Sequence, residues 1–250
     1  MLLAGSLSAG TALATPITFT GSNTGLGLAA SVTFDTSGTN LIVTLTNTSS
    51  ADIMNPGQVL TAVFFDIPSA GTLGKVSALL GPGSTVFYDA QGQPALGIVG
   101  GEWAYKTALS GAPLGATEGI SSSGFSGGVS FGPPNLFPGA DLQPPTSPDG
   151  VQYGILSAGD NTATGNTGIT GSGGLIKNQV VITLSGLPGG FDPSAAGAIL
   201  HVSFQYGTAL TDANVPGEPP PPPVPEPATL ALLGVGLLGI SLMMRRRRAP

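Results

Sequence analysis

LAASVTFDTSGTNLIVTLTN, residues 28–47, is the stretch that best indicates the fold class of this chain. In both halves, apolar residues recur at every second position; these are Leu28, Ala30, Val32, Phe34, Leu41, Val43 and Leu45. Such a period of two is typical of strands with one buried face, and residues 36–40 between the halves favour a turn. The stretch therefore predicts an antiparallel hairpin that packs one face onto a core.

Further strands are predicted around this hairpin. The alternation returns at residues 180–184 and 200–206, whereas residues 59–65 are apolar on both faces, which predicts a strand in the middle of the core. No window of 11 residues in the body of the chain shows a helical stripe with caps. Short strands between Gly/Pro turns predict an all-β fold, an antiparallel β-sandwich of jelly-roll or Greek-key type over residues 15–217. Residues 111–150, rich in Gly, Ser and Pro, are either a long ordered surface loop or a cover over one end of the sandwich.

The composition supports one folded domain and excludes several functions. Charged residues are 8% of the 250 residues, but 41% are hydrophobic, which argues against disorder despite 40 Gly and 23 Pro. The body carries 11 carboxylates against three lysines and no arginine, so it would repel phosphates, and nucleic-acid binding is excluded. With no cysteine, the chain has no disulfide, thiolate nucleophile or cysteine metal site.

The first residues have the features of a secretory signal. Residues 2–14 are small and apolar and end in Ala12-Leu13-Ala14, a small-x-small cleavage pattern before Thr15. No Lys or Arg follows Met1 to form a positive region, so we expect the natural start to lie upstream. We predict a signal peptide over residues 1–14; the alternative is a buried N-terminal helix or strand.

The last residues predict a membrane anchor. Residues 218–223 form an acidic, proline-rich spacer that favours an extended polyproline II conformation. After Pro225, Glu226 and Pro227, residues 228–244 carry no charge, and at about 1.5 Å per residue they are near the lower limit for a transmembrane helix. Four arginines follow, and the positive-inside rule places residues 245–250 in the cytoplasm and the body outside the membrane.

These ordered elements resemble the PEP-CTERM sorting signal of exported bacterial surface proteins. The resemblance rests on Pro225, Glu226 and Pro227, on the short apolar stretch, and on Arg245, Arg246, Arg247 and Arg248. It implies recognition by an exosortase, a membrane-embedded cysteine transpeptidase that cuts near the Pro-Glu-Pro element and passes the protein toward the surface. It also implies work alongside exopolysaccharide, in biofilm or floc formation. The alternative is a plain C-terminal anchor after a proline-rich stalk.

The body has a weaker resemblance to known proteins. The stretches GGEWAYK at 100–106 and SFQYGTAL at 203–210 resemble the shared ectodomain of a group of exosortase-dependent surface proteins. No biochemical activity follows from that resemblance.

Two glycine motifs match catalytic or cofactor patterns in sequence but lack the flanking secondary structure that those patterns require. Gly-x-Ser-x-Gly occurs at 124–128 and 128–132, but it leads into Pro133-Pro134 rather than into the helix that a nucleophile elbow requires. Gly234, Gly236 and Gly239 fit a dinucleotide fingerprint, yet they lie in the apolar segment with no strand before them. Their small size favours the close approach of a partner helix instead.

The single histidine limits the possible chemistry. A Ser-His-Asp catalyst would have to use His201, and a histidine metal site would have only one imidazole. By alternation, His201 lies on the polar face of its strand with Ser203 and Gln205, opposite Leu200 and the other apolar residues. We therefore expect no enzymatic activity and no cofactor.

Three groups of residues in the body leave alternatives open. Glu102, Trp103 and Tyr105 are a possible glycan contact because aromatic rings stack on sugars, but a single tryptophan also suits the core. Asp141, Asp149 and Asp160 are either calcium ligands or solvated loop acids; EF-hand spacing is absent, and we predict no metal site. The sequence Asn47-Thr48-Ser49 fits the N-glycosylation pattern, and the many Ser and Thr residues could equally accept O-linked sugars.

The leading hypothesis is a non-enzymatic cell-surface or matrix protein, anchored in the inner membrane as an intermediate and sorted by an exosortase. The second hypothesis is a carbohydrate-binding module displayed on the envelope, with extracellular polysaccharide as its partner. The third is a surface hydrolase.

Overall fold

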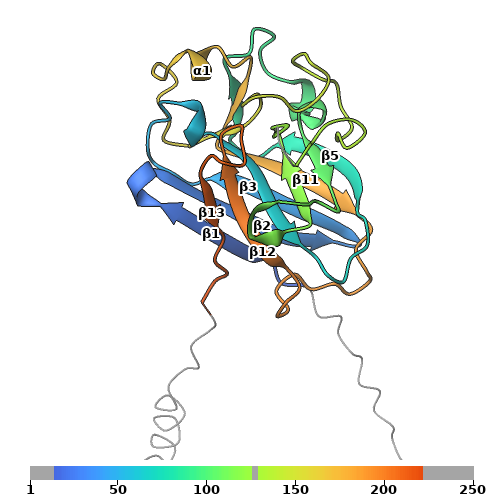
Figure 1. Ribbon diagram of the computed structural model, residues 1–250. Coiled ribbons are helices and arrows are strands. Elements are labelled where there is room, and N and C mark those ends of the chain that lie inside the picture. The colour runs from blue at the N-terminus through green and yellow to red at the C-terminus, as the bar shows by residue number, and fades with distance from the viewer. Residues whose placement is uncertain (1–13, 126–128, 222–250) are drawn as a thin grey trace, which may run out of the picture. The chain divides into compact units, whose positions relative to one another are not determined.

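The computed structural model describes residues 14–125 and 129–221 and shows an all-β fold built from two sheets (Figure 1). One sheet has five strands, all antiparallel, in the order β1-β2-β3-β11-β5. Its strands are β1 (Ile17–Asn23), β2 (Leu28–Ser37), β3 (Asn40–Asn47), β11 (Gln179–Ser185) and β5 (Gly74–Leu80). The predicted hairpin is confirmed as β2 and β3. Its turn is tighter than expected, because Ser37 pairs with Asn40 and leaves only Gly38 and Thr39 between the strands.

The other sheet has eight strands in mixed directions. Its order is β13-β12-β4-β9-β10-β6, with β8 also beside β4 and β7 beside β8; β9 and β10 are parallel. Its strands are β13 (Asn214–Pro216), β12 (Leu200–Tyr206), β4 (Leu60–Asp66), β9 (Ile155–Leu156), β10 (Leu175–Lys177), β6 (Thr85–Phe87), β8 (Glu118–Ser121) and β7 (Ala104–Lys106).

Helical structure in the described part of the chain is confined to single turns. These are α1 (Thr167–Thr170) and the 3-10 turns η1 (Thr24–Leu26), η2 (Pro56–Gln58), η3 (Ala95–Gly97), η4 (Gly100–Glu102) and η5 (Pro113–Gly115). Among the residues described, no helix is long and apolar enough to cross a membrane. Three predicted features lie wholly or largely outside the described ranges: the transmembrane helix at 228–244, the basic tail at 245–250, and residues 1–13 of the predicted signal peptide.

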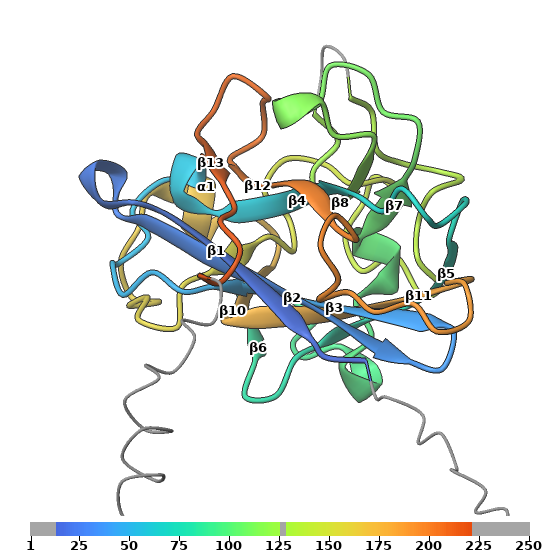
Figure 2. The ribbon, with the colours of Figure 1, turned by 90° about the horizontal axis from the view of Figure 1, so that it is seen from below.

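The two sheets share one apolar core. Figure 2 shows β4 and β12 on one side of this core and β1, β2, β3 and β11 on the other. Phe34 of β2 and Phe65 of β4 meet edge to face with their ring centroids 5.2 Å apart, and both side chains are fully buried. The apolar positions of the alternating strands β2, β3 and β11 all turn into this cluster, which explains their period of two.

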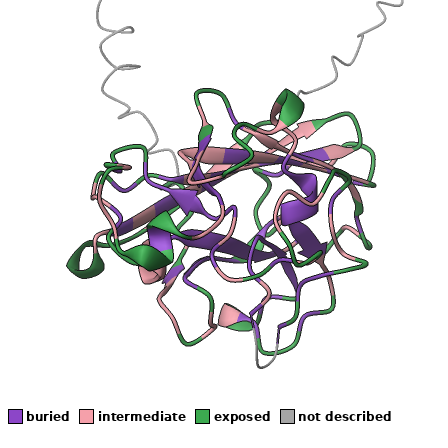
Figure 3. Cartoon of the chain, turned by 90° about the horizontal axis from the view of Figure 1, so that it is seen from above, coloured by how far each residue is buried: buried purple, intermediate pink, exposed green. Residues whose placement is uncertain are grey.

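Strand β4 is buried on both faces, as its sequence predicted. While Phe65 faces the first sheet, Phe64 packs on the opposite face against Phe125 and Phe131, at centroid distances of 6.2 and 6.3 Å. The loop-rich segment that supplies these two rings therefore covers the outer face of the second sheet (Figure 2). This position differs from both alternatives for residues 111–150, a loop on the surface and a cover over one end. Figure 3 shows that buried stretches occur in loops as well as in strands.

The alternation predicted for β12 is wrong at its start. A bulge separates Leu200 from Ser203, and His201 sits in it with φ of +52°. Leu200 is consequently exposed, whereas Ser203 and Gln205 are buried. The Gln205 amide donates to the carbonyls of Ala209 and Asp212 at 3.0 and 3.3 Å, so the turn that follows β12 covers its polar face.

Candidate functional site

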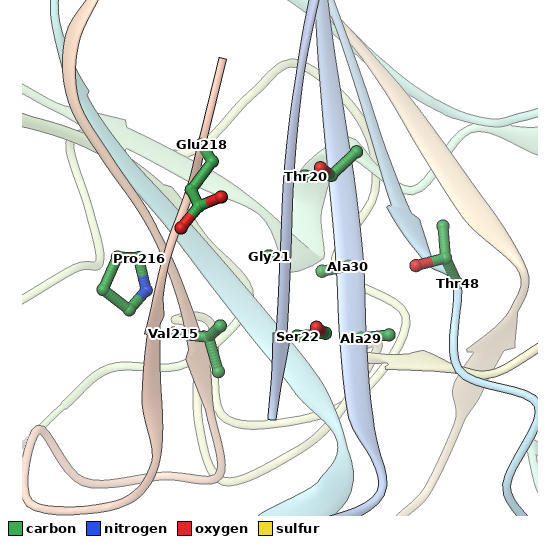
Figure 4. Close-up of a pocket in the computed structure, with 9 residues that line it drawn as sticks. All are labelled: Thr20, Gly21, Ser22, Ala29, Ala30, Thr48, Val215, Pro216 and Glu218. Atoms are coloured by element: carbon green, nitrogen blue, oxygen red, sulfur yellow. The ribbon is translucent and has the colours of Figure 1, made fainter. Parts of the chain in front are cut away.

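The end of the folded body is tied to both sheets. We call residues 214–218 the exit segment, because the chain leaves the body there; it begins with β13, which pairs with β12. The Gly217 N–H donates to the Val202 carbonyl at 2.8 Å. Thr20 and Glu218 then exchange two backbone hydrogen bonds: Thr20 N to Glu218 O at 3.0 Å and Glu218 N to Thr20 O at 2.7 Å. The exit segment therefore joins the second sheet to the outer edge of β1 (Figure 4).

A hollow of about 310 Å³ lies beside this junction. Its lining includes the hydroxyl residues Thr20, Ser22 and Thr48, the apolar residue Val215, and one carboxylate, Glu218 (Figure 4). Hydroxyls and a single exposed carboxylate offer hydrogen bonds. A single carboxylate falls short of the three or more charged or imidazole ligands that a metal site usually has.

The close approach of the exit segment to β1 depends on Gly21. A Cβ at this position would lie 2.5 Å from the Pro216 carbonyl oxygen and 3.0 Å from side-chain atoms of Phe204 and Val215. We expect Gly21→Ala to push the exit segment away and to lower the free energy of unfolding by about 1–3 kcal/mol. Chemical denaturation measures this, and Gly189→Ala, where a Cβ meets nothing within 4 Å, is the control. Equal stability of the two variants would contradict the prediction.

The proposed glycan residues are buried. Trp103 and Tyr105 are 0% and 2% exposed and belong to the core shared by the two sheets, and Glu102 is 2% exposed. The Tyr105 hydroxyl donates to Glu118 Oε2 at 2.6 Å. In this arrangement none of the three side chains offers a surface on which a sugar ring could stack.

Glu102 anchors a neighbouring loop instead. Its Oε1 accepts the backbone N–H groups of Leu142 and Gln143 at 2.6 and 2.7 Å. Burial raises the pKa of Glu102 to about 8, the nearby Asp141 carboxylate adds to this rise, and the two N–H donors only partly offset it. A buried carboxyl group that stays protonated near neutral pH and holds two loop amides acts as a structural anchor.

His201 pairs with a carboxylate that the sequence did not point to. Its Nδ1 lies 2.5 Å from Asp66 Oδ2, and Thr117 donates its N–H and its hydroxyl to Asp66 Oδ1 at 2.6 and 2.7 Å. Burial opposes ionisation of Asp66, but the hydrogen bonds from His201 and Thr117 outweigh it and lower the pKa. The antiparallel pairing of β4 with β12 brings the two residues together across 135 positions of sequence, so no local pattern signals the pair.

The serine of the second Gly-x-Ser-x-Gly motif, Ser130, makes no hydrogen bond to this pair. Ser126 lies outside the described residues, and Ser130 is exposed, with its carbonyl accepting a hydrogen bond from Lys106 Nζ at 2.8 Å. Among the described side chains, the hydrogen-bond partner of His201 is Asp66, and no serine joins them.

The structure does not bring the three candidate calcium ligands together. Asp141 lies beside Glu102, whereas Asp160 accepts the Ile53 N–H at 2.9 Å and lies beside Asp52. The backbone carbonyl of Asp149 accepts the Gln152 N–H within a turn. Within residues 14–125 and 129–221, no group of three such side chains could hold a metal ion.

Asn47 of the glycosylation pattern is also inaccessible. It is 0% exposed, and its amide donates to the Ile155 carbonyl at 2.9 Å and accepts the Ser49 N–H at 3.2 Å. A folded body therefore does not present this side chain to a glycosyltransferase.

Comparison with known proteins identifies the segment that follows the exit segment. The model of the PEP-CTERM protein-sorting motif matches residues 223–248, which include Pro225, Glu226, Pro227 and the four arginines, all outside the described residues. Searches of curated proteins and of solved structures found no match. The match indicates an exported protein with a membrane-anchored intermediate that an exosortase processes. Residues 223–248 are thus a PEP-CTERM protein-sorting motif, and Glu218 makes the last backbone hydrogen bonds of the described residues before it.

Proposed function

We propose that this chain is a non-enzymatic cell-surface or extracellular-matrix protein that an exosortase delivers to the surface, where it works alongside exopolysaccharide. The sorting motif at 223–248 carries the proposal, because it marks the chain for export and processing. The body supports it: among the described residues, the last backbone hydrogen bonds are those of Glu218, seven positions before Pro225. A cut at the Pro-Glu-Pro element would therefore leave the fold intact.

The same proposal extends to the start of the chain and to the architecture. Cleavage after Ala14 would free a chain whose first strand begins at Ile17, so the mature protein would lose no part of β1. The two sheets with their common core favour a β-sandwich of jelly-roll or Greek-key type. Among the described side chains no hydroxyl group hydrogen-bonds the His201 ring, so the proposal assigns this residue no catalytic role.

The carbohydrate-binding alternative loses its candidate residues, since Glu102, Trp103 and Tyr105 are interior. Polysaccharide association would then involve other surfaces of the body. A polysaccharide pull-down with the mature protein tests this association, and the absence of binding to every polysaccharide tried would remove that part of the proposal.

The sorting step is tested by replacing Pro225, Glu226 and Pro227 together with alanine. We expect the full-length precursor to accumulate in the membrane fraction and surface delivery to stop, because the exosortase loses its recognition element. Mass spectrometry of the protein and fractionation of the cells measure both effects. Alanine at positions 221 and 222, which lie next to the motif and outside it, is the control. Unchanged processing of the first variant would leave a plain membrane anchor.

A further inference from the structure

The outer edge of β1 has backbone groups that pair with no described residue. In an antiparallel strand, the N–H and C=O groups of alternate residues point to the same side. Since Thr20 bonds outward to Glu218, Thr18 and Ser22 also point outward, away from β2. Thr20 is the position on this edge that pairs with the described exit segment, and no described residue pairs with Thr18 on that side. An open edge of this kind readily recruits another strand.

The register of the junction places prolines on both sides of Glu218. An antiparallel pair at Thr20 and Glu218 sets Ser22 opposite Pro216 and would set Thr18 opposite Pro220. Figure 4 shows Pro216 and Glu218 following one another along β1, next to Ser22 and Thr20. Proline has no N–H to donate, so neither flanking position can complete a reciprocal pair. Residues 219–223 are all proline, so a shifted register would also place a residue without an N–H opposite Thr18.

We propose that this run of prolines, and Pro220 above all, ends the β-ladder at Glu218 and so keeps the sorting motif free for the exosortase. This inference rests on the proposed function. Pro225 lies seven positions after Glu218, and this stretch reaches at most about 25 Å when it is extended. If pairing with β1 continued through residue 222, only three residues would remain, with a reach of about 10 Å. The Pro-Glu-Pro element would then lie close against the folded body, where a membrane-embedded enzyme has little access to it.

The test compares two double variants of the full-length chain. Pro219→Thr/Pro220→Val restores two N–H groups and adds strand-forming residues where the ladder would continue. Pro221→Thr/Pro222→Val makes the same chemical change outside the sorting motif but leaves Pro219 and Pro220 in place, so it is the matched control. The first readout is the rate at which precursor converts to the processed mass in cells. The second is the hydrogen exchange of the Thr18 amide in the purified chain.

We expect the first variant to be processed several-fold more slowly, with slower exchange at Thr18, and the control to behave like the natural chain. Unchanged exchange at Thr18 and unchanged processing in the first variant would overturn the inference. Equal slowing in both variants would also overturn it, since the composition of the spacer would then be responsible. The alanine replacement of Pro225, Glu226 and Pro227 keeps the two proposals apart. If that variant stays unprocessed while both double variants mature at the natural rate, the sorting function stands and the role of Pro220 falls.

Discussion

Replacing Trp103 with alanine is expected to lower the free energy of unfolding of the body by about 3–5 kcal/mol. Trp103 is fully buried among apolar side chains of both sheets, so its removal leaves a large cavity as well as the lost transfer energy. Its indole N–H has no hydrogen-bond partner in the structure, so the loss comes from packing alone. Because Trp103 is the only tryptophan, denaturation should be followed by far-ultraviolet circular dichroism rather than by fluorescence.

Two further variants show whether burial is the cause. Trp103→Phe fills part of the cavity and should cost less than the alanine variant. Leu96→Ala removes a leucine that is 91% exposed and should leave the stability nearly unchanged. A Trp103→Ala protein as stable as the natural one would place this ring on the surface and revive the glycan-contact hypothesis. Loss of stability assigns it to the core.

The parts of the fold that the sequence predicted are those with a strong local pattern. β2, β3 and β11 alternate because one face is buried and the other is not, and β4 is apolar throughout because both of its faces are covered. The two edge strands of the five-stranded sheet, β1 and β5, were not predicted, since they have one buried residue each and so carry little alternation. Six strands of two to four residues were also missed: β6, β7, β8, β9, β10 and β13. A strand of that length is too short to display a period, and its place in the sheet is set by its neighbours.

The side-chain contacts of the candidate sites could not be predicted from the sequence for a different reason. Gln205 looked like a surface residue because alternation shows only that two faces differ, while the covering turn is determined by tertiary packing. Asp66 and His201 meet through strand pairing across 135 positions. The sorting motif is the opposite case, since its recognition depends on order and spacing along the chain, and those are read directly from sequence.

The stability of the body is expected to fall as the pH rises from about 5 to about 9, and Glu102 should account for much of the change. In the unfolded chain its carboxyl group ionises around its ordinary pKa of 4.5, whereas burial keeps the folded pKa at about 8. Between these values the folded state holds a proton that the unfolded state has lost, so unfolding releases a proton and becomes easier as the pH rises. Below the lower value both states are protonated, and above the upper value both are ionised, so the effect levels off at each end.

Glu102→Gln separates this titration from the hydrogen bonds. The amide oxygen can still accept from the N–H groups of Leu142 and Gln143, but the side chain no longer loses a proton. Burial also raises the pKa of Glu118 and Asp160, and both keep titrating in the variant, so some slope with the same sign should remain. The informative quantity is therefore the difference in melting temperature between variant and natural protein, measured from pH 5 to pH 9. It should grow in favour of glutamine up to about pH 8, and a constant difference would show that Glu102 is already ionised in the fold.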